Sequence, residues 1–347
     1  MLITLILVAS SETPIYAQAQ TPNEVRMEAV VIQRLGVNKL EVKLINAKQK
    51  DNKVIIETKT SPVTGRIDYK IGDKLIIVKS HDAAGRDFYY IADFVRRTPL
   101  YLLFGLFVAL TAVVGRRRGL ASLLGMALSF FILFTVVLNP VLAGQPAITM
   151  TIFAALFIIP ATFYLSHGIN KKTTSAVIGT ILTLILAGLL SAVFVESARL
   201  TGFASEEAVF IQSQRPDVIN VKGLLFAGII IGLLGILDDI TISQSSIVHQ
   251  LKKTSPKLSS KELFSKAMDV GRDHIASMVN TLVLVYTGAA MPLLLLFITN
   301  SRPFSEIINF EIVAEEIVRT LIASCSLILA VPITTFIAVQ MFKHDQS

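Results

Sequence analysis

Apolar residues follow two different patterns along this chain of 347 residues. From about residue 22 to residue 95, apolar and polar positions alternate with a period of two, and turn residues separate the runs. This alternation is typical of half-buried strands. After residue 98 the apolar positions join into seven long blocks, each long enough to cross a lipid bilayer. The pattern therefore predicts a small β domain followed by a bundle of membrane-spanning helices.

The β domain at 22–95 is expected to contain five short strands. They are predicted at Val25–Leu35, Lys39–Ala47, Lys53–Thr60, Arg66–Lys70 together with Lys74–Lys79, and Phe88–Phe94. The turns between them are supplied by Asp51-Asn52, Thr64-Gly65, Ile71-Gly72-Asp73 and Ala84-Gly85. Five short strands favour a small closed barrel, because closure removes exposed sheet edges. Charged residues alternate on its outer face, which indicates a solvated surface rather than a binding site.

The apolar blocks are predicted to be seven transmembrane helices of a domain at 98–342. They cover 98–114, 119–140, 147–166, 174–195, 223–243, 278–299 and 317–341. Residues 250–275 are interpreted as a cytoplasmic interfacial segment, in which Ser259 and Glu262 have the spacing of a capping box. Pro140 and Pro160 fall inside predicted helices, where interrupted backbone tends to line cavities.

The basic residues of the connecting segments predict the orientation of these helices. Most of them follow the first, third, fifth and seventh blocks, at Arg116 to Arg118, Lys171 and Lys172, the run from Lys252 to Arg272, and Lys343. Basic segments stay in the cytoplasm, so the β domain is expected outside and the C-terminus inside. Arg96 and Arg97 lie on the other side and are expected at the lipid headgroups or against the β domain.

Residues 1–19 support the same orientation. Leu2–Ala9 form a short apolar core, and Ala17-Gln18-Ala19 fits a small-x-small cleavage pattern. The segment is therefore predicted to be a signal peptide. We expect a multi-pass protein of the cytoplasmic (plasma) membrane.

Composition supports a membrane protein, since 53% of the residues are hydrophobic and only 16% are charged, against about 25% charged in soluble domains. The net charge of +7 is explained by the basic connecting segments, so the expected partner is the lipid bilayer and not nucleic acid. The single cysteine, Cys325, excludes an intramolecular disulfide. No phosphate-binding loop, HExxH or Gly-x-Ser-x-Gly motif is present, so we expect no enzyme activity, no cofactor and no metal.

The predicted helix at 223–243 and its extension carry the densest set of candidate residues. Steps of 4, 3, 4, 4 and 3 place six small or polar residues on one face, namely Gly228, Gly232, Gly235, Asp239, Ser243 and Ser246. Glycines on one face of a membrane helix let a neighbouring helix pack closely. A carboxylate within a span is costly and usually functional. We therefore expect helix packing at the glycines and an operating group at Asp239, unless Asp239 lies at the inner interface.

Three further polar groups extend this prediction. Asp238 is rotated about 100° from Asp239, and one of the two carboxylates is expected to operate while the other is interfacial. His249 continues the polar face toward the cytoplasm. In the sixth predicted helix, Asn280 is expected inside the membrane, either as a clamp between two helices or as a substrate contact, with Asp273 at the inner mouth.

Two segments resemble the YibE/F-like family of bacterial membrane proteins. They are Gly-Ile-Leu-Asp-Asp-Ile-Thr-Ile-Ser-Gln-Ser-Ser-Ile-Val-His at 235–249 and Gly-Arg-Asp-His-Ile-Ala-Ser-Met-Val-Asn-Thr-Leu-Val-Leu-Val-Tyr at 271–286. The resemblance assigns the family's motif residues to Asp239, Ser243, Ser245, Ser246, Gly271, Arg272, Asp273, Asn280 and Thr281. Asp238 and Gln244 stand where the family is usually apolar. The resemblance implies a multi-pass membrane protein, often encoded beside a shorter sister protein, and implies no substrate.

The leading hypothesis from the sequence is a transport protein that uses polar contacts between the fifth and sixth helices. One alternative is a non-transporting envelope scaffold or sensor, whose outer β domain binds a partner. Another is the permease subunit of an ATPase-driven transporter, docked through 259–271. A homo-oligomer or a sister membrane subunit is the expected protein partner.

Overall fold

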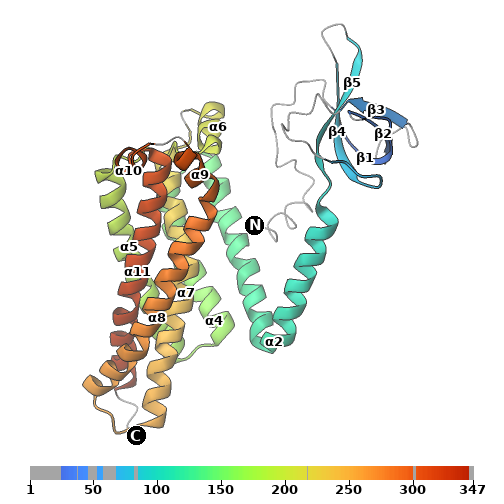
Figure 1. The fold of residues 1–347 in the computed structure, drawn as a ribbon. Helices are drawn as coiled ribbons and strands as arrows, with labels where there is room; N and C mark the ends of the chain where they lie inside the picture. The colour runs from blue at the N-terminus through green and yellow to red at the C-terminus, as the bar shows by residue number, and fades with distance from the viewer. Residues whose placement is uncertain are drawn as a thin grey trace. The chain divides into compact units, whose positions relative to one another are not determined.

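The computed structural model describes residues 25–36, 38–45, 53–57, 68–81, 85–216, 218–299 and 302–343. The predicted signal peptide at 1–19 and the predicted turns at Asp51-Asn52 and Thr64-Gly65 lie outside the described residues. The chain divides into two compact units, Met1–Leu110 and Thr111–Ser347. The strands belong to the first unit and the helical bundle belongs to the second (Figure 1).

The first unit contains one antiparallel sheet of five strands in the order β3-β2-β1-β4-β5. The strands are β1 (Val25–Arg34), β2 (Lys39–Leu44), β3 (Lys53–Glu57), β4 (Lys74–His81) and β5 (Asp87–Phe94). Their alternating apolar residues turn to one face and form a core that includes Val31, Leu40, Val42, Leu75 and Ile77. The predicted period of two therefore corresponds to a real sheet with one buried face.

The sheet is a half-barrel, and this corrects the closed barrel expected from the sequence. β3 and β5 are its edges, and no ladder joins them in the parts of 25–94 that the structure describes. An edge strand as short as β3 leaves few unpaired backbone groups, so closure would gain little. The strand predicted at Arg66–Lys70 is also wrong over 68–70, because the Lys70 N–H donates to Asp73 Oδ2 (2.8 Å) in a turn.

Arg96 and Arg97 contact the β domain, one of the two places expected for them. Arg96 pairs with Asp93 (2.6 Å), and Arg97 pairs with Glu28 of β1. The neighbouring guanidinium of Arg96 lowers the pKa of the Asp93 carboxyl. Both arginines are therefore paired with carboxylates of the sheet.

The rest of the described chain is helical. Its elements are α2 (Arg97–Ile132), the π-helix η2 (Leu133–Leu138), α3 (Asn139–Leu142), α4 (Ala147–His167), α5 (Lys171–Ser197), α6 (Glu206–Gln214), α7 (Val221–Thr254), α8 (Ser260–Ala289), α9 (Met291–Thr299), α10 (Phe304–Ile307) and α11 (Glu311–Phe342). Five segments of the described chain are long and apolar enough to cross a membrane, namely Arg97–Leu142, α4, α5, α7 and α11. The pair α8 and α9, bent by 64°, makes six if it counts as one span.

The α2 helix is interrupted at Arg116, whose φ of 49° and ψ of −135° are not helical. A Cβ placed on Gly119 would lie 2.1 Å from the carbonyl oxygen of Thr111. Residues eight apart in a straight helix are separated by ~12 Å, so the chain reverses at the three arginines. The sequence predicted a break between 114 and 119, at the same place. A count of seven spans treats each arm of α2 as a span and stays a prediction.

The 250–275 segment is not a separate element. Its first residues end α7, and the remainder forms the first half of α8, which continues to Ala289. The capping box predicted at Ser259 and Glu262 is present at the start of α8. The part after Ser259 therefore continues without a break into the helix predicted at 278–299, and its position at the membrane surface stays a prediction.

The core of the bundle lies where α5, α7, α8 and α11 meet. Its buried apolar residues include Ala187, Ile230, Leu233, Leu237, Ile240 and Leu327. Hydroxyl pairs join α5 to α7, with Thr180 Oγ1 2.7 Å from Thr241 Oγ1. The amide of Gln244 donates to the Ala267 carbonyl (2.9 Å) and to Thr335 Oγ1 (2.7 Å), which links α7 to α8 and α11.

Candidate functional site

The glycine stripe of α7 lies on its exposed face. A Cβ on Gly228 or Gly235 would meet nothing within 4 Å, and one on Gly232 would meet only the Tyr286 hydroxyl at 3.8 Å. Asp239 continues the same exposed face. The expected close packing between helices of one chain is therefore absent at these three glycines. A shared spacing shows that residues lie on one face, but not which way that face turns.

Two other glycines make the close helix contacts of the bundle. A Cβ on Gly179 of α5 would lie 2.4 Å from Thr334 Oγ1 of α11. A Cβ on Gly271 of α8 would lie 2.6 Å from Val331 Cγ1 and 3.1 Å from the Gln244 side chain. The resemblance singled out Gly271 without giving it a packing role, and sequence reasoning missed Gly179, because neither forms a stripe with other glycines of its helix.

Asp238, and not Asp239, lines a cavity of the bundle. The cavity has a volume of about 300 Å³ and lies between α7, α4 and the segment from Met126 to Leu133. Apolar side chains such as Phe130, Phe163 and Leu234 form most of its wall. The Asp238 side chain is half-buried, and its carboxylate makes no hydrogen bond or ion pair with the described residues.

A π-helix and a proline-containing helix border this cavity, near the two prolines that the sequence singled out. Leu133 opens the π-helix that precedes Pro140, while Ile159 and Thr162 flank Pro160 in α4. A π-turn inside a helix is frequent at functional sites. The wall also contains two hydroxyls whose hydrogens are committed to their own helices: Ser129 Oγ donates to the Gly125 carbonyl (3.0 Å), and Thr162 Oγ1 donates to the Ile158 carbonyl (2.8 Å).

Asp239 belongs to a different neighbourhood from Asp238. It exerts an electrostatic effect on His167, as do Lys172 and Arg118. These three basic residues lie at the end of α4, at the start of α5 and just after the break of α2. Asp239 therefore lies close to charged groups at helix ends and is not on the cavity wall.

The other predicted residues are not brought to the cavity. Ser243 and Ser246 are half-buried, and Ser246 Oγ donates to the Ile242 carbonyl of its own helix (2.7 Å). The His249 ring packs against Phe342, with 5.0 Å between centroids. Asn280 and Asp273 are exposed on α8, and in the described chain neither side chain has a hydrogen bond or an ion pair.

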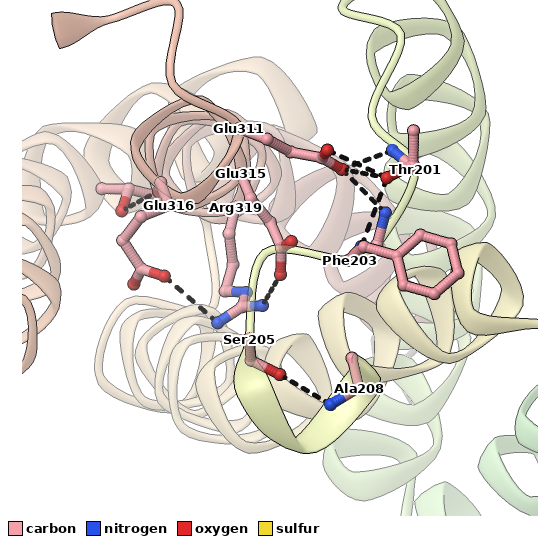
Figure 2. A network of polar contacts seen from close by, with 10 residues as sticks. Thr201, Phe203, Ser205, Ala208, Glu311, Glu315, Glu316 and Arg319 are labelled. Carbon is pink, nitrogen blue, oxygen red and sulfur yellow. Dashed lines mark hydrogen bonds and ion pairs between the residues drawn. The ribbon is translucent and has the colours of Figure 1, made fainter. Parts of the chain in front are cut away.

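A second polar network, shown in Figure 2, surrounds the first turns of α11. The Glu311 carboxylate accepts hydrogen bonds from the Gly202 N–H (2.9 Å) and the Thr201 hydroxyl (2.7 Å), so it fixes the α5–α6 connection. Arg319 donates to Glu315 (2.7 Å) and Glu316 (3.2 Å). Sequence spacing could have suggested the Arg319 pairs, but nothing local announces a contact between Glu311 and a loop 110 residues away. This network ties the first turns of α11 to the α5–α6 connection.

Comparison with known proteins identifies the helical part of the chain. The model of the family described as YibE/F-like protein matches residues 103–344. The match includes both segments that suggested the resemblance, which is therefore confirmed. Neither a curated protein nor a solved structure matches the chain. The match names no chemistry, so the chemistry must be argued from the cavity.

Proposed function

This chain belongs to the YibE/F-like family, and we propose that it is a transport protein of the membrane in which Asp238 is the operating carboxylate. The observation that carries the proposal is an unpaired carboxylate on the wall of a 300 Å³ cavity inside a helical bundle. An ionisable group held within membrane-spanning helices is expensive and marks a pathway for protons or substrates. Interrupted helices around it supply backbone that can rearrange.

The proposed topology has seven spans, with the β domain outside and the C-terminus in the cytoplasm. It treats the arms of α2 before and after Arg116 as separate spans and counts α8 with α9 as one. Its support is the bias of Lys and Arg toward alternate connections. The predicted signal peptide supports the same orientation in a plasma membrane.

To test this function, two adjacent carboxylates are replaced one at a time in the full-length protein. Asp238→Asn should abolish complementation of a strain that lacks the gene, while membrane abundance stays normal. The matched variant Asp239→Asn removes the same charge one residue away, outside the cavity, and should retain most activity. Full complementation by Asp238→Asn would exclude Asp238 as the operating group.

A deletion of residues 25–95 separates a transporter from a sensor. A transporter should keep part of its activity without the β domain, because the cavity is built entirely by helices. A receptor that senses through this domain should lose its response completely. Complete loss with normal membrane abundance would therefore contradict the transport proposal.

We also propose that a second copy of the chain covers the exposed face of α7 and α8. Asp239, Ser277 and Asn280 are exposed on segments that are candidates for the membrane, where uncovered polar groups are costly. Gly232 lies beside Tyr286, and Gln244 bonds to the Ala267 carbonyl, so α7 and α8 run antiparallel and Asp239 is level with the region of Ser277. A two-fold axis along the membrane normal keeps each residue at the same depth in both copies. It therefore brings Asp239 of one copy to the Ser277 hydroxyl of the other.

Cysteine cross-linking in native membranes tests this arrangement. In a Cys325→Ser background, Gly228→Cys should form a covalent dimer, because that position has open space around it. Leu189→Cys, exposed on α5, is the matched control and should stay monomeric. Equal cross-linking at both positions, or cross-linking only to another protein, would overturn the homodimer.

A further inference from the structure

The polar part of the cavity wall offers acceptors and almost no donors. Asp238 contributes an unpaired carboxylate. The hydroxyl hydrogens of Ser129 and Thr162 already point to the carbonyls of Gly125 and Ile158, so each oxygen retains only lone pairs for a ligand. A ligand that satisfies this wall must therefore bring its own hydrogen-bond donors.

The remaining wall excludes a strongly hydrated ligand. It is formed by aromatic and aliphatic side chains that include Phe130, Phe163, Ile158 and Leu234. A bare metal ion requires several oxygen or nitrogen ligands around it, and within the described ranges no group of three His, Cys, Asp or Glu side chains converges. An anion would meet Asp238 with no basic side chain on the wall. An apolar molecule with one positively charged donor group supplies hydrogen bonds to the acceptors of the wall and apolar surface to the rest of it.

We propose that the Asp238 cavity binds an amphipathic monovalent organic cation, such as a protonated amine on a small apolar group. The proposal rests on the transport function above and names its substrate class. The ammonium group would donate to the Asp238 carboxylate and to the oxygens of Ser129 and Thr162. The apolar group would lie against the rings of Phe130 and Phe163, which add a favourable face for a cation. A volume of about 300 Å³ is at the small end for ligand pockets, so a single ring with a short amine fits this class.

Asp239 and its basic neighbours set the electrostatic background without lining the cavity. Arg118, Lys172 and Asp239 all act on His167, and none of the four contributes to the cavity wall. The charges of Arg118 and Lys172 oppose that of Asp239. Recognition of a cation therefore depends on Asp238, and Asp239 serves as the matched control in the experiment.

Equilibrium binding to the full-length protein in lipid nanodiscs, at neutral pH, tests this inference. The probe is phenethylammonium, with 2-phenylethanol as the uncharged analogue of similar shape. Wild type should bind the cation at least tenfold more tightly than the alcohol, because a hydrogen bond to a charged group is worth at least that factor. Asp238→Asn should lose at least that tenfold preference, and Asp239→Asn should keep it.

A steric variant keeps the test valid if Asp238→Asn is poorly folded. Gly235 borders the cavity and has no neighbour within 4 Å, so Gly235→Leu can occupy the space without a clash. It should abolish probe binding, whereas Gly105→Leu, which also has no neighbour within 4 Å but lies outside the cavity, should bind as wild type does. Equal affinity for the cation and the alcohol, or unchanged binding in both cavity variants, would overturn the inference.

The binding result and the complementation result are independent. If Asp238→Asn abolishes complementation while wild type does not distinguish the probe from its alcohol, the transport function stands and the substrate class is wrong. If the probe binds selectively through Asp238 while Asp238→Asn still complements, the site is confirmed and the transport function is wrong.

Discussion

The inward and outward faces of α7 differ in what their small and polar residues do. On the inward face, Thr241, Gln244 and Ser245 are buried and bond to neighbouring helices. On the outward face, Gly228 and Gly235 have no neighbour, and Asp239 is exposed. The outward face has the more regular spacing, yet the inward face holds the bundle together. Regular spacing along a helix therefore identifies one face of it but does not show that this face packs inside the chain.

The largest difference in stability is expected between two bulky substitutions, one at a glycine that contacts another helix and one at a glycine that does not. Gly179→Val places a side chain where Thr334 already lies, 2.4 Å from the new Cβ. We expect a loss of about 1–3 kcal/mol in the free energy of unfolding, measured by thermal unfolding in detergent. Gly228→Val enters space that is open within one chain, so it should change the stability of the detergent-dissolved monomer by less than about 0.5 kcal/mol. Equal destabilisation would mean that the outward face is packed within one chain.

A smaller difference in stability is expected between substitutions of two glutamines of α7. Gln244→Leu leaves Thr335 Oγ1 without its bonding partner in a buried contact and should cost about 1–2 kcal/mol. Gln250→Leu changes an exposed side chain one and a half turns further on and should be nearly neutral. The measurement is the midpoint of chemical unfolding for the two variants in the same detergent. Similar midpoints would show that Gln244 does not fasten the three helices.

The smallest difference in stability is expected between substitutions of two adjacent serines. Ser245 Oγ lies 2.5 Å from Ser175 Oγ and donates to the Lys172 carbonyl (2.7 Å), so it joins α7 to α5. Ser246 Oγ donates only within α7. Ser245→Ala should cost about 1 kcal/mol, and hydrogen exchange at the start of α5 should rise with it. Ser246→Ala should alter neither quantity, and a reversed order of the two variants would contradict the assigned faces.

Local signals in the sequence predicted local structure well. The alternation of apolar residues marked the strands, and the spacing of Ser259 and Glu262 marked the start of α8. The arginines at 116–118 marked the reversal in α2. Each of these features depends on residues a few positions apart, so a pattern in one segment carries all the necessary information.

Features that depend on distant segments were not predictable in the same way. Asp238 lines the cavity because α4 and the end of α2 lie on its side of α7, and nothing within 223–243 records that arrangement. The contact of Gly179 with Thr334 joins residues far apart in sequence. The sequence favours Asp239, which shares a face with the glycines, but a rotation of about 100° separates the two carboxylates without showing which face turns to a cavity.

Gln244 has a consequence for any motion of the bundle. Its amide bonds to a carbonyl of α8 and a hydroxyl of α11 at once, and both bonds exist at a single axial alignment of these helices. Sliding α8 along α7 by one residue would shift the carbonyl by ~1.5 Å and strand the amide in an apolar environment. The side chain of Gln244 therefore fixes the axial alignment of α7, α8 and α11. A movement that keeps both hydrogen bonds must rotate these helices about Gln244, because sliding them along one another would break the bonds.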